Sequence, residues 1–138
     1  MNHGVWSRFI IAGLAGLMAS GFAGAQVVEF NRDIRPILSD NCFACHGPDK
    51  NQRKGDLRID TEEGAFADRG DTKVLVAGKP EQSELVRRIT HNDDKKRMPP
   101  AKFGKRLTDR EIELLRRWVE QGARWQKHWS LKIGRAHV

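Results

Sequence analysis

The sequence has little cysteine, no tyrosine and few apolar residues for its length. Only two cysteines occur among 138 residues, which excludes a scaffold held by several disulfides and a zinc site built from four cysteines. Hydrophobic residues make up 38% of the chain, a low share for a domain with an entirely apolar core. Charged residues make up 31%, with both signs interleaved, which argues against a long disordered tail of one charge. We therefore expect one small domain in which something besides bulk hydrophobicity stabilises the fold.

The N-terminal segment 1–25 has the pattern of a secretory signal peptide. Residues 9–22 are apolar or small, and Ala23-Gly24-Ala25 supplies the small residues that signal peptidase requires. The alternative, an uncleaved membrane anchor, is disfavoured because the apolar stretch is too short to span about 30 Å of hydrocarbon as a helix. The sequence predicts an exported, periplasmic or otherwise extracytoplasmic protein, with no stable membrane span after signal cleavage.

The last six residues, 133–138, match the translation of a common short-read sequencing adapter. The alternative is a genuine polar C-terminus. We favour the adapter interpretation, which makes residues 131–138 a truncated end and predicts that the natural protein continues beyond Lys132. The folded domain is expected to occupy residues 26–130.

Apolar spacing and turn-forming residues predict short helices joined by polar loops. Helical segments are expected over 27–40 after an extended start, over 61–67, from a cap at or near Ser83 to Ile89, and over 108–121. Loops are expected over 42–54 and 91–103, and a brief strand over 74–76.

The last of these helices has the best-defined ends. Thr108 and Glu111 fit a capping box, and Leu107 and Ile112 fit the hydrophobic staple that accompanies it. Gly122 marks the C-terminal end. One apolar stripe is expected to face the core: Ile112, Leu115, Trp118 and Val119.

Both cysteines lie in one pentapeptide, Cys42-Phe43-Ala44-Cys45-His46. Cys-x-x-Cys-His is the attachment signal of c-type haem. Two thiols three residues apart on a tight turn can form thioethers with the two haem vinyl groups, and His46 then lies under the iron as proximal ligand. The signal peptide supports this, since attachment takes place outside the bacterial cytoplasm. The sequence thus predicts one haem c, bound covalently through Cys42 and Cys45.

Three other interpretations of the two cysteines stay open. A redox dithiol uses the same Cys-x-x-Cys but expects a strand before it and a long helix after it, whereas Gly47-Pro48-Asp49 follows here. A disulfide between Cys42 and Cys45 would close a very small ring and stabilise little. A zinc site would need four ligands, and no second cysteine pair exists. We favour haem attachment over all three.

Met98 is the methionine that can serve as distal haem ligand, since the other two lie in segment 1–25. It lies in Arg97-Met98-Pro99-Pro100, where the prolines can hold a loop against the distal haem face. A purely structural methionine would instead fill a gap on a helix or strand face. Ligation by His and Met raises the reduction potential relative to two histidines. The weaker candidates for the distal position are His91 and then His128.

The order of helix, Cys-x-x-Cys-His, loop, methionine and C-terminal helix resembles the class I cytochrome c fold. In detail, the chain resembles the planctomycete-type cytochrome c domain over residues 27–130. The matching stretches are 30–38, 41–49, 53–58, 78–89, 97–100, 107–123, Trp125 and His128-Trp129. The resemblance implies an all-α domain with short extended segments around one haem, at the start of a longer secreted chain with further C-terminal domains.

These features favour a non-enzymatic electron-transfer module that carries single electrons to a redox partner protein or to fused C-terminal domains. A mild positive ring around the haem edge would steer an acidic partner. Nucleic acid is excluded as a partner because the positive charges are scattered among carboxylates and no binding module is present. No catalytic triad, carboxylate pair or phosphate loop stands out. The alternative is a haem sensor, ligand-binding or peroxidase-like module with an open distal site.

Overall fold

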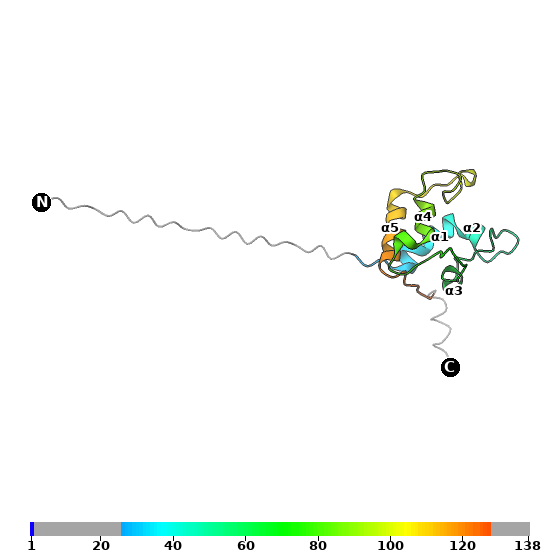
Figure 1. Cartoon of the computed structure of the whole chain (residues 1–138), viewed down its shortest axis with the longest axis horizontal. Coiled ribbons are helices and arrows are strands. Elements are labelled where there is room, and N and C mark those ends of the chain that lie inside the picture. The colour runs from blue at the N-terminus through cyan, green and yellow to red at the C-terminus, as the bar shows by residue number, and fades with distance from the viewer. Residues whose placement is uncertain (2–25, 128–138) are drawn as a thin grey trace, which may run out of the picture.

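A computed structural model of the chain describes residue 1 and residues 26–127. The signal-peptide and adapter predictions and the candidate ligand His128 fall outside this part. Within it the elements are helical, without a strand (Figure 1), so the all-α prediction is confirmed there. The elements are η1 (Phe30–Ile34), α1 (Arg35–Asn41), α2 (Phe43–His46), α3 (Glu62–Ala65), η2 (Pro80–Gln82), α4 (Glu84–Ile89), η3 (Ala101–Phe103) and α5 (Asp109–Glu120). None of the helices in the described part has the length and apolar character needed to cross a membrane.

The helix expected over 27–40 is present as η1, a π-helical turn, continued by α1. Pro36 lies in the first turn of α1, where its missing N–H is not needed and its fixed φ suits the helix. One face of the pair is buried, with Phe30, Ile34, Ile37 and Leu38 turned into the core. These side chains join the first helix to the C-terminal one.

The capping box and the apolar stripe predicted for α5 are confirmed. The Thr108 hydroxyl accepts from the Glu111 N–H at 3.3 Å, and the Glu111 carboxylate accepts from the Thr108 N–H at 2.8 Å. Leu115, Trp118 and Val119 are buried, and Ile112 packs against them. Gly122 ends the helix with a φ of 99°, which glycine adopts without strain.

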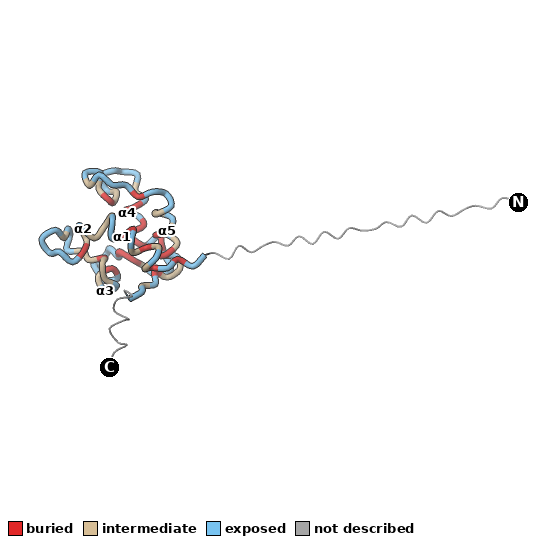
Figure 2. Tube along the Cα trace, turned by 180° about the vertical axis from the view of Figure 1, so that it is seen from behind, coloured by how far each residue is buried: buried red, intermediate tan, exposed pale blue. Residues whose placement is uncertain are grey.

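The core is formed by apolar side chains of η1, α1, α4 and α5, with α5 in contact with both η1 and α4, and Figure 2 shows the buried residues concentrated among these helices. Its centre is aromatic: the ring centroids of Phe30 lie 5.5 Å from Trp118 and 4.2 Å from Trp125. The two ends of the domain are therefore held together by large apolar surfaces. In Figure 1 the loop after α2 extends to the right of this core, and the long loop between α4 and α5 extends above it.

The strand predicted over 74–76 is wrong. Its backbone pairs with the start of α4: the Val74 carbonyl accepts from the Leu85 N–H at 3.1 Å, and the Val76 N–H donates to the Ser83 hydroxyl at 2.9 Å. Ser83 is at the predicted N-cap position, but its side chain is fully buried and makes no cap bond to the helix. The Ser83 hydroxyl instead hydrogen-bonds the backbone of the preceding loop. In the described part no neighbouring strand is present to bond these buried backbone groups.

Candidate functional site

The sequence predicts a loop throughout 42–54, but the structure has one helical turn there, α2 (Phe43–His46). The Cys42 carbonyl accepts from the N–H groups of Cys45 and His46 at 3.1 and 2.8 Å. The Cys42 N–H in turn donates to Leu38 of α1 at 2.8 Å. The Cys-x-x-Cys-His segment directly follows α1 and continues it with one more hydrogen-bonded turn. Because this turn is bonded to α1, it fixes the positions of both cysteines and the histidine relative to that helix.

Gly47 ends this turn, and no larger residue fits there. A Cβ on Gly47 would overlap the carbonyl oxygen of Phe43, a backbone atom that cannot rotate away. The sequence marks Gly47 only as a chain breaker after the pentapeptide. The close approach between two backbone segments is visible only in the structure.

A cavity of about 180 Å³ lies between α2 and the segment around Met98. One wall comes from the end of α1, α2 and the loop behind it, and the other from residues 98–103. The lining residues are Asn41, Cys42, Cys45, His46, Lys54, Met98, Pro99, Pro100, Lys102 and Phe103. Cys42, Cys45 and His46 precede Met98 by 52 to 56 positions in the chain, yet all four residues expected to hold haem line this one cavity. Their roles as haem anchors and ligands stay predictions.

His91, the second candidate for the distal position, lines other surface cavities instead. Its Nδ1 accepts a hydrogen bond from the Asp93 N–H at 2.9 Å. One ring nitrogen is therefore already used in a local turn. Of the two candidates that the structure describes, only Met98 faces the pentapeptide across the cavity.

The electrostatics of the cysteines argue against the dithiol alternative. Burial, with a smaller contribution from Cys45, raises the pKa of the Cys42 thiol to about 12. Redox-active dithiols depend on a lowered thiol pKa, because the thiolate is the reactive form. Cys42 is accordingly a neutral thiol at neutral pH, and neither cysteine is in a disulfide.

His46 has the properties of an iron ligand. Burial lowers its pKa, while the Lys54 backbone acts in the opposite direction and the charge of Arg69 lowers it further. The imidazole is therefore neutral at pH 7, as ligation requires. Its Nδ1 is buried and has no hydrogen-bond partner in the described part, and an unpaired buried nitrogen costs stability. Imidazole and thioether are both iron ligands of haem proteins, so the donor set fits the group.

The alternative of a protein-only metal site is disfavoured. Within residues 26–127, no cluster of three or more His, Cys, Asp or Glu side chains could hold a metal ion. A zinc site needs four such ligands, or three and a water. The cavity offers one histidine and two cysteines beside a methionine, and a haem would bring the other iron ligands with it.

The loop that carries Met98 is tied to the helices by residues for which the sequence offers no signal. The Met98 N–H donates to the Arg88 carbonyl at 3.0 Å. The Arg88 guanidinium bonds Glu84 at 2.6 Å and the Lys96 carbonyl at 3.2 Å. At the far end, Lys105 donates to the Asp40 carbonyl at 3.0 Å. The contacts of Met98 and Lys96 with Arg88 join the loop to α4, and the long-range contact from Lys105 joins it to α1.

Comparison with known proteins bears on the same stretch of chain. Residues 42–102 match the family described as Planctomycete cytochrome C, and the matched stretch includes all four predicted haem residues. No curated protein and no solved structure matches the chain. A cytochrome c domain is generally a haem-binding electron-transfer unit of the extracytoplasmic space rather than a catalyst. Over residues 42–102 the chain is therefore similar to the planctomycete cytochrome C family.

Proposed function

We propose that this domain holds one haem c and works as a single-electron carrier. The haem is attached to Cys42 and Cys45, and its iron is ligated by His46 and Met98. The observation that carries the proposal is the single cavity onto which these four residues open. The helix order around that cavity agrees with a class I cytochrome c arrangement, in which the distal methionine follows the Cys-x-x-Cys-His segment.

Each residue has a definite task in this proposal. The S–H of each cysteine adds across one vinyl group, the sulfur bonding one carbon and the hydrogen the other, so no oxidant is consumed. The neutral His46 ring offers a nitrogen lone pair, and the soft Met98 sulfur favours ferrous iron. Pro99, which is buried, and Phe103 exclude water from the cavity wall. The haem, when bound, supplies a one-electron couple.

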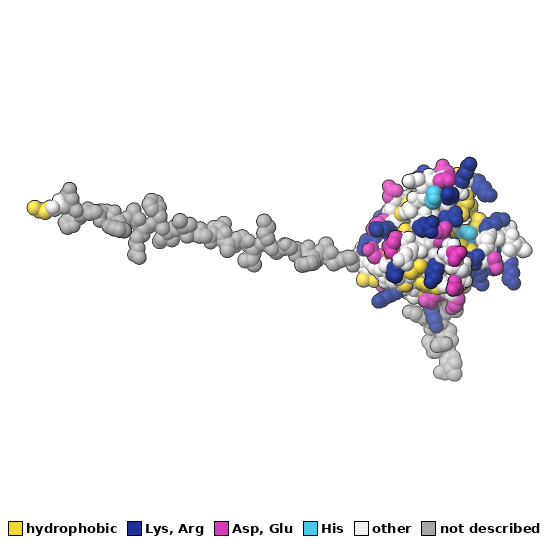
Figure 3. All heavy atoms as spheres, viewed as in Figure 1, with side chains coloured by type: hydrophobic (Ala, Val, Ile, Leu, Met, Phe, Trp, Pro, Cys, Tyr) yellow, Lys and Arg dark blue, Asp and Glu magenta, His cyan; other side chains and the backbone are white. Residues whose placement is uncertain are grey.

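The partner in this proposal is an acidic surface, on a separate redox protein or on a fused C-terminal domain. Lys54 and Lys102 line the cavity, and Lys105 lies 6.0 Å from the ring centre of Phe103, another lining residue. Elsewhere acidic and basic side chains are interleaved, as Figure 3 shows for one face, which is unlike a nucleic-acid surface. Electron transfer to an acidic partner should slow as salt is added, because screening weakens the attraction.

Covalent attachment is the direct test. The protein, expressed with a c-type maturation system, should retain its haem through acid-acetone extraction. Cys42→Ala combined with Cys45→Ala should release it. Met98→Ala is the control, because it alters ligation and leaves the thioethers in place. Haem that extracts freely from the wild-type protein would overturn the proposal.

A further inference from the structure

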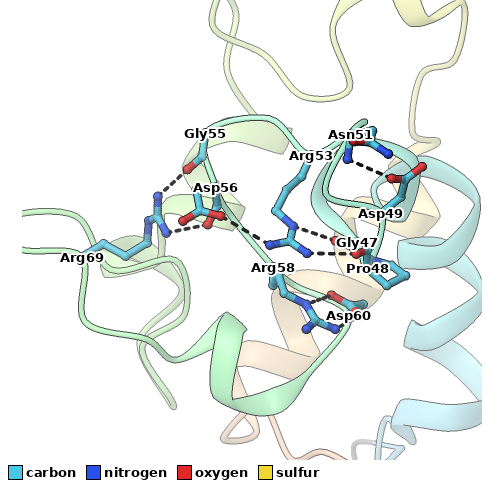
Figure 4. Close-up of polar contacts among 10 residues, drawn as sticks. All are labelled: Gly47, Pro48, Asp49, Asn51, Arg53, Gly55, Asp56, Arg58, Asp60 and Arg69. Carbon is cyan, nitrogen blue, oxygen red and sulfur yellow. Dashed lines mark hydrogen bonds and ion pairs between the residues drawn. The ribbon is translucent and has the colours of Figure 1, made fainter.

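Arg53 is a nearly buried cation next to the proposed proximal ligand, and no part of the proposed chemistry uses it. Its side chain is 11% exposed. Its Nε donates to the Gly47 carbonyl and its Nη2 to the Pro48 carbonyl, both at 3.0 Å. Gly47 and Pro48 directly follow His46, and Figure 4 shows the guanidinium directed at these two carbonyls. Arg53 therefore clamps the backbone at the exit of the His46 turn.

The loop that Arg53 closes returns to α2 itself. The Lys54 N–H donates to the Cys45 carbonyl at 2.8 Å, and the Ile59 N–H donates to the His46 carbonyl at 2.9 Å. Because α2 is a single turn, these carbonyls have no partners in a longer helix. The residue after Arg53 thus supplies one of the two contacts that hold the end of the turn.

The contacts of Arg53 depend on the shape of the guanidinium more than on its charge. Its carboxylate partner, Asp56, is 3.4 Å away with a side chain 93% exposed, and such surface pairs contribute little. The two carbonyl contacts need donors in a fixed planar fork, which lysine lacks. Arg58, in the same loop, bonds only the Asp60 carboxylate, at 2.6 and 3.0 Å (Figure 4).

We propose that Arg53 is a positioning residue for His46. It fixes the Gly47 and Pro48 carbonyls and thereby the orientation of the His46 ring toward the iron. This inference rests on the proposed function, since it takes His46 as the proximal ligand. Outer-shell residues that orient a metal ligand act in this way, and their loss weakens metal binding roughly 10- to 100-fold.

The test compares Arg53→Lys with Arg58→Lys in the haem-loaded protein. Both keep the charge and change one guanidinium of the same loop. Nitric oxide added to the reduced protein weakens the iron bond opposite to it, so the rate of forming five-coordinate haem measures how firmly His46 is held. We expect this rate to rise at least about 10-fold in Arg53→Lys and to stay unchanged in Arg58→Lys. Equal rates in wild type and Arg53→Lys would overturn the inference.

A second measurement needs no substitution. In ¹⁵N NMR of the wild-type protein, the Nε–H of Arg53 should exchange with solvent far more slowly than that of Arg58, whose side chain is 39% exposed. The Lys54 and Ile59 amides should be protected in the wild-type protein, and both should lose protection in Arg53→Lys. Fast exchange at Arg53 Nε–H would remove the basis of the clamp.

The two proposals fail differently. If the wild-type haem is extractable, the proposed function fails whatever Arg53 does. If haem is covalent in every variant and Arg53→Lys keeps wild-type nitric oxide kinetics, only the role of Arg53 is wrong.

Discussion

Met98 is the residue that distinguishes the electron-transfer proposal from the alternative of a ligand-binding module. As an iron ligand, the Met98 thioether would favour the ferrous state and keep small ligands off the iron. The same side chain, turned away, would leave a site for small ligands. In the structure Met98 lines the cavity opposite His46, which supports the first arrangement.

Substitution of Met98 should therefore change the spectrum and the potential together. The oxidised wild-type protein should show the weak sulfur-to-iron charge-transfer band at the red end of the visible spectrum. Met98→Ala should remove the band, lower the potential and admit carbon monoxide or azide, and Met98→His should restore six-coordination at a lower potential. Phe103→Leu, which changes the lining without removing a ligand, should keep the band. Rapid carbon monoxide binding by a wild type without the band would favour the sensor or peroxidase-like alternative.

Gly47→Ala should damage the site through the backbone. The added Cβ meets the Phe43 carbonyl, so α2 must shift, at a cost of about 1–3 kcal/mol in unfolding free energy. Urea unfolding of the haem-loaded protein measures the loss, and the visible spectrum should change with it. Gly70→Ala is the control: Gly70 has a φ of 76° and open space around it, so it costs about 1 kcal/mol or more in strain and should leave the spectrum unchanged. A wild-type spectrum in Gly47→Ala would contradict the close packing.

At the scale of elements, the first helix is anchored by a carboxylate. Asp33 accepts from the Glu29 N–H at 2.8 Å and pairs with Arg32 at 2.7 Å. The hydrogen bonds from Arg32 are the main cause that lowers the pKa of Asp33, and the Glu29 N–H adds to it. This contact lies in the first turn of η1, beside the buried Phe30.

Acid should weaken this helix start. A pKa that is lower in the folded than in the unfolded protein stabilises the fold above the unfolded value, near 3.8, and this gain is lost as pH falls through the folded value. Denaturation curves should thus show a loss of stability below about pH 4, and the loss should be smaller in Asp33→Asn. Asp40→Asn, at an exposed position, is the control and should follow the wild type. Identical pH profiles for all three proteins would refute the assignment.

At the scale of the whole molecule, the fold depends on two kinds of apolar contact. The aromatic cluster of Phe30, Trp118 and Trp125 joins the two ends of the domain. The cavity between α2 and residues 98–103 exposes mainly apolar surface on its walls. A domain of this size buries a marginal core, so a porphyrin in the cavity would supply the missing surface.

The haem-free protein should consequently fold poorly. Circular dichroism should show weak helical signal and no cooperative thermal transition, whereas the haem-loaded protein should unfold cooperatively. The double variant Cys42→Ala with Cys45→Ala, expressed without haem, is the matched control for thiol effects and should behave like the haem-free wild type. A cooperative transition in the haem-free protein would show that the aromatic side of the core suffices.

The sequence by itself determined the features that depend on neighbours a few positions apart. The pentapeptide from Cys42 to His46 indicates its chemistry by spacing alone, and the capping box of Thr108 and Glu111 follows from positions three residues apart. These interactions close within one or two turns, so they do not depend on the rest of the fold. Met98 is the candidate distal ligand because the other two methionines lie in segment 1–25. The sequence does not say how close Met98 lies to α2.

Only the tertiary structure decided which surfaces meet. Residues 74–76 have the composition of a strand, yet their backbone bonds the start of α4. Buried backbone groups need hydrogen-bond partners, and the packing of the chain decides which partners are near enough. The clamp of Arg53 and the tie from Arg88 to Met98 join groups whose approach depends on loop closure. Local propensity does not specify such closure, since its free energy comes from the contacts that form only when the chain is folded.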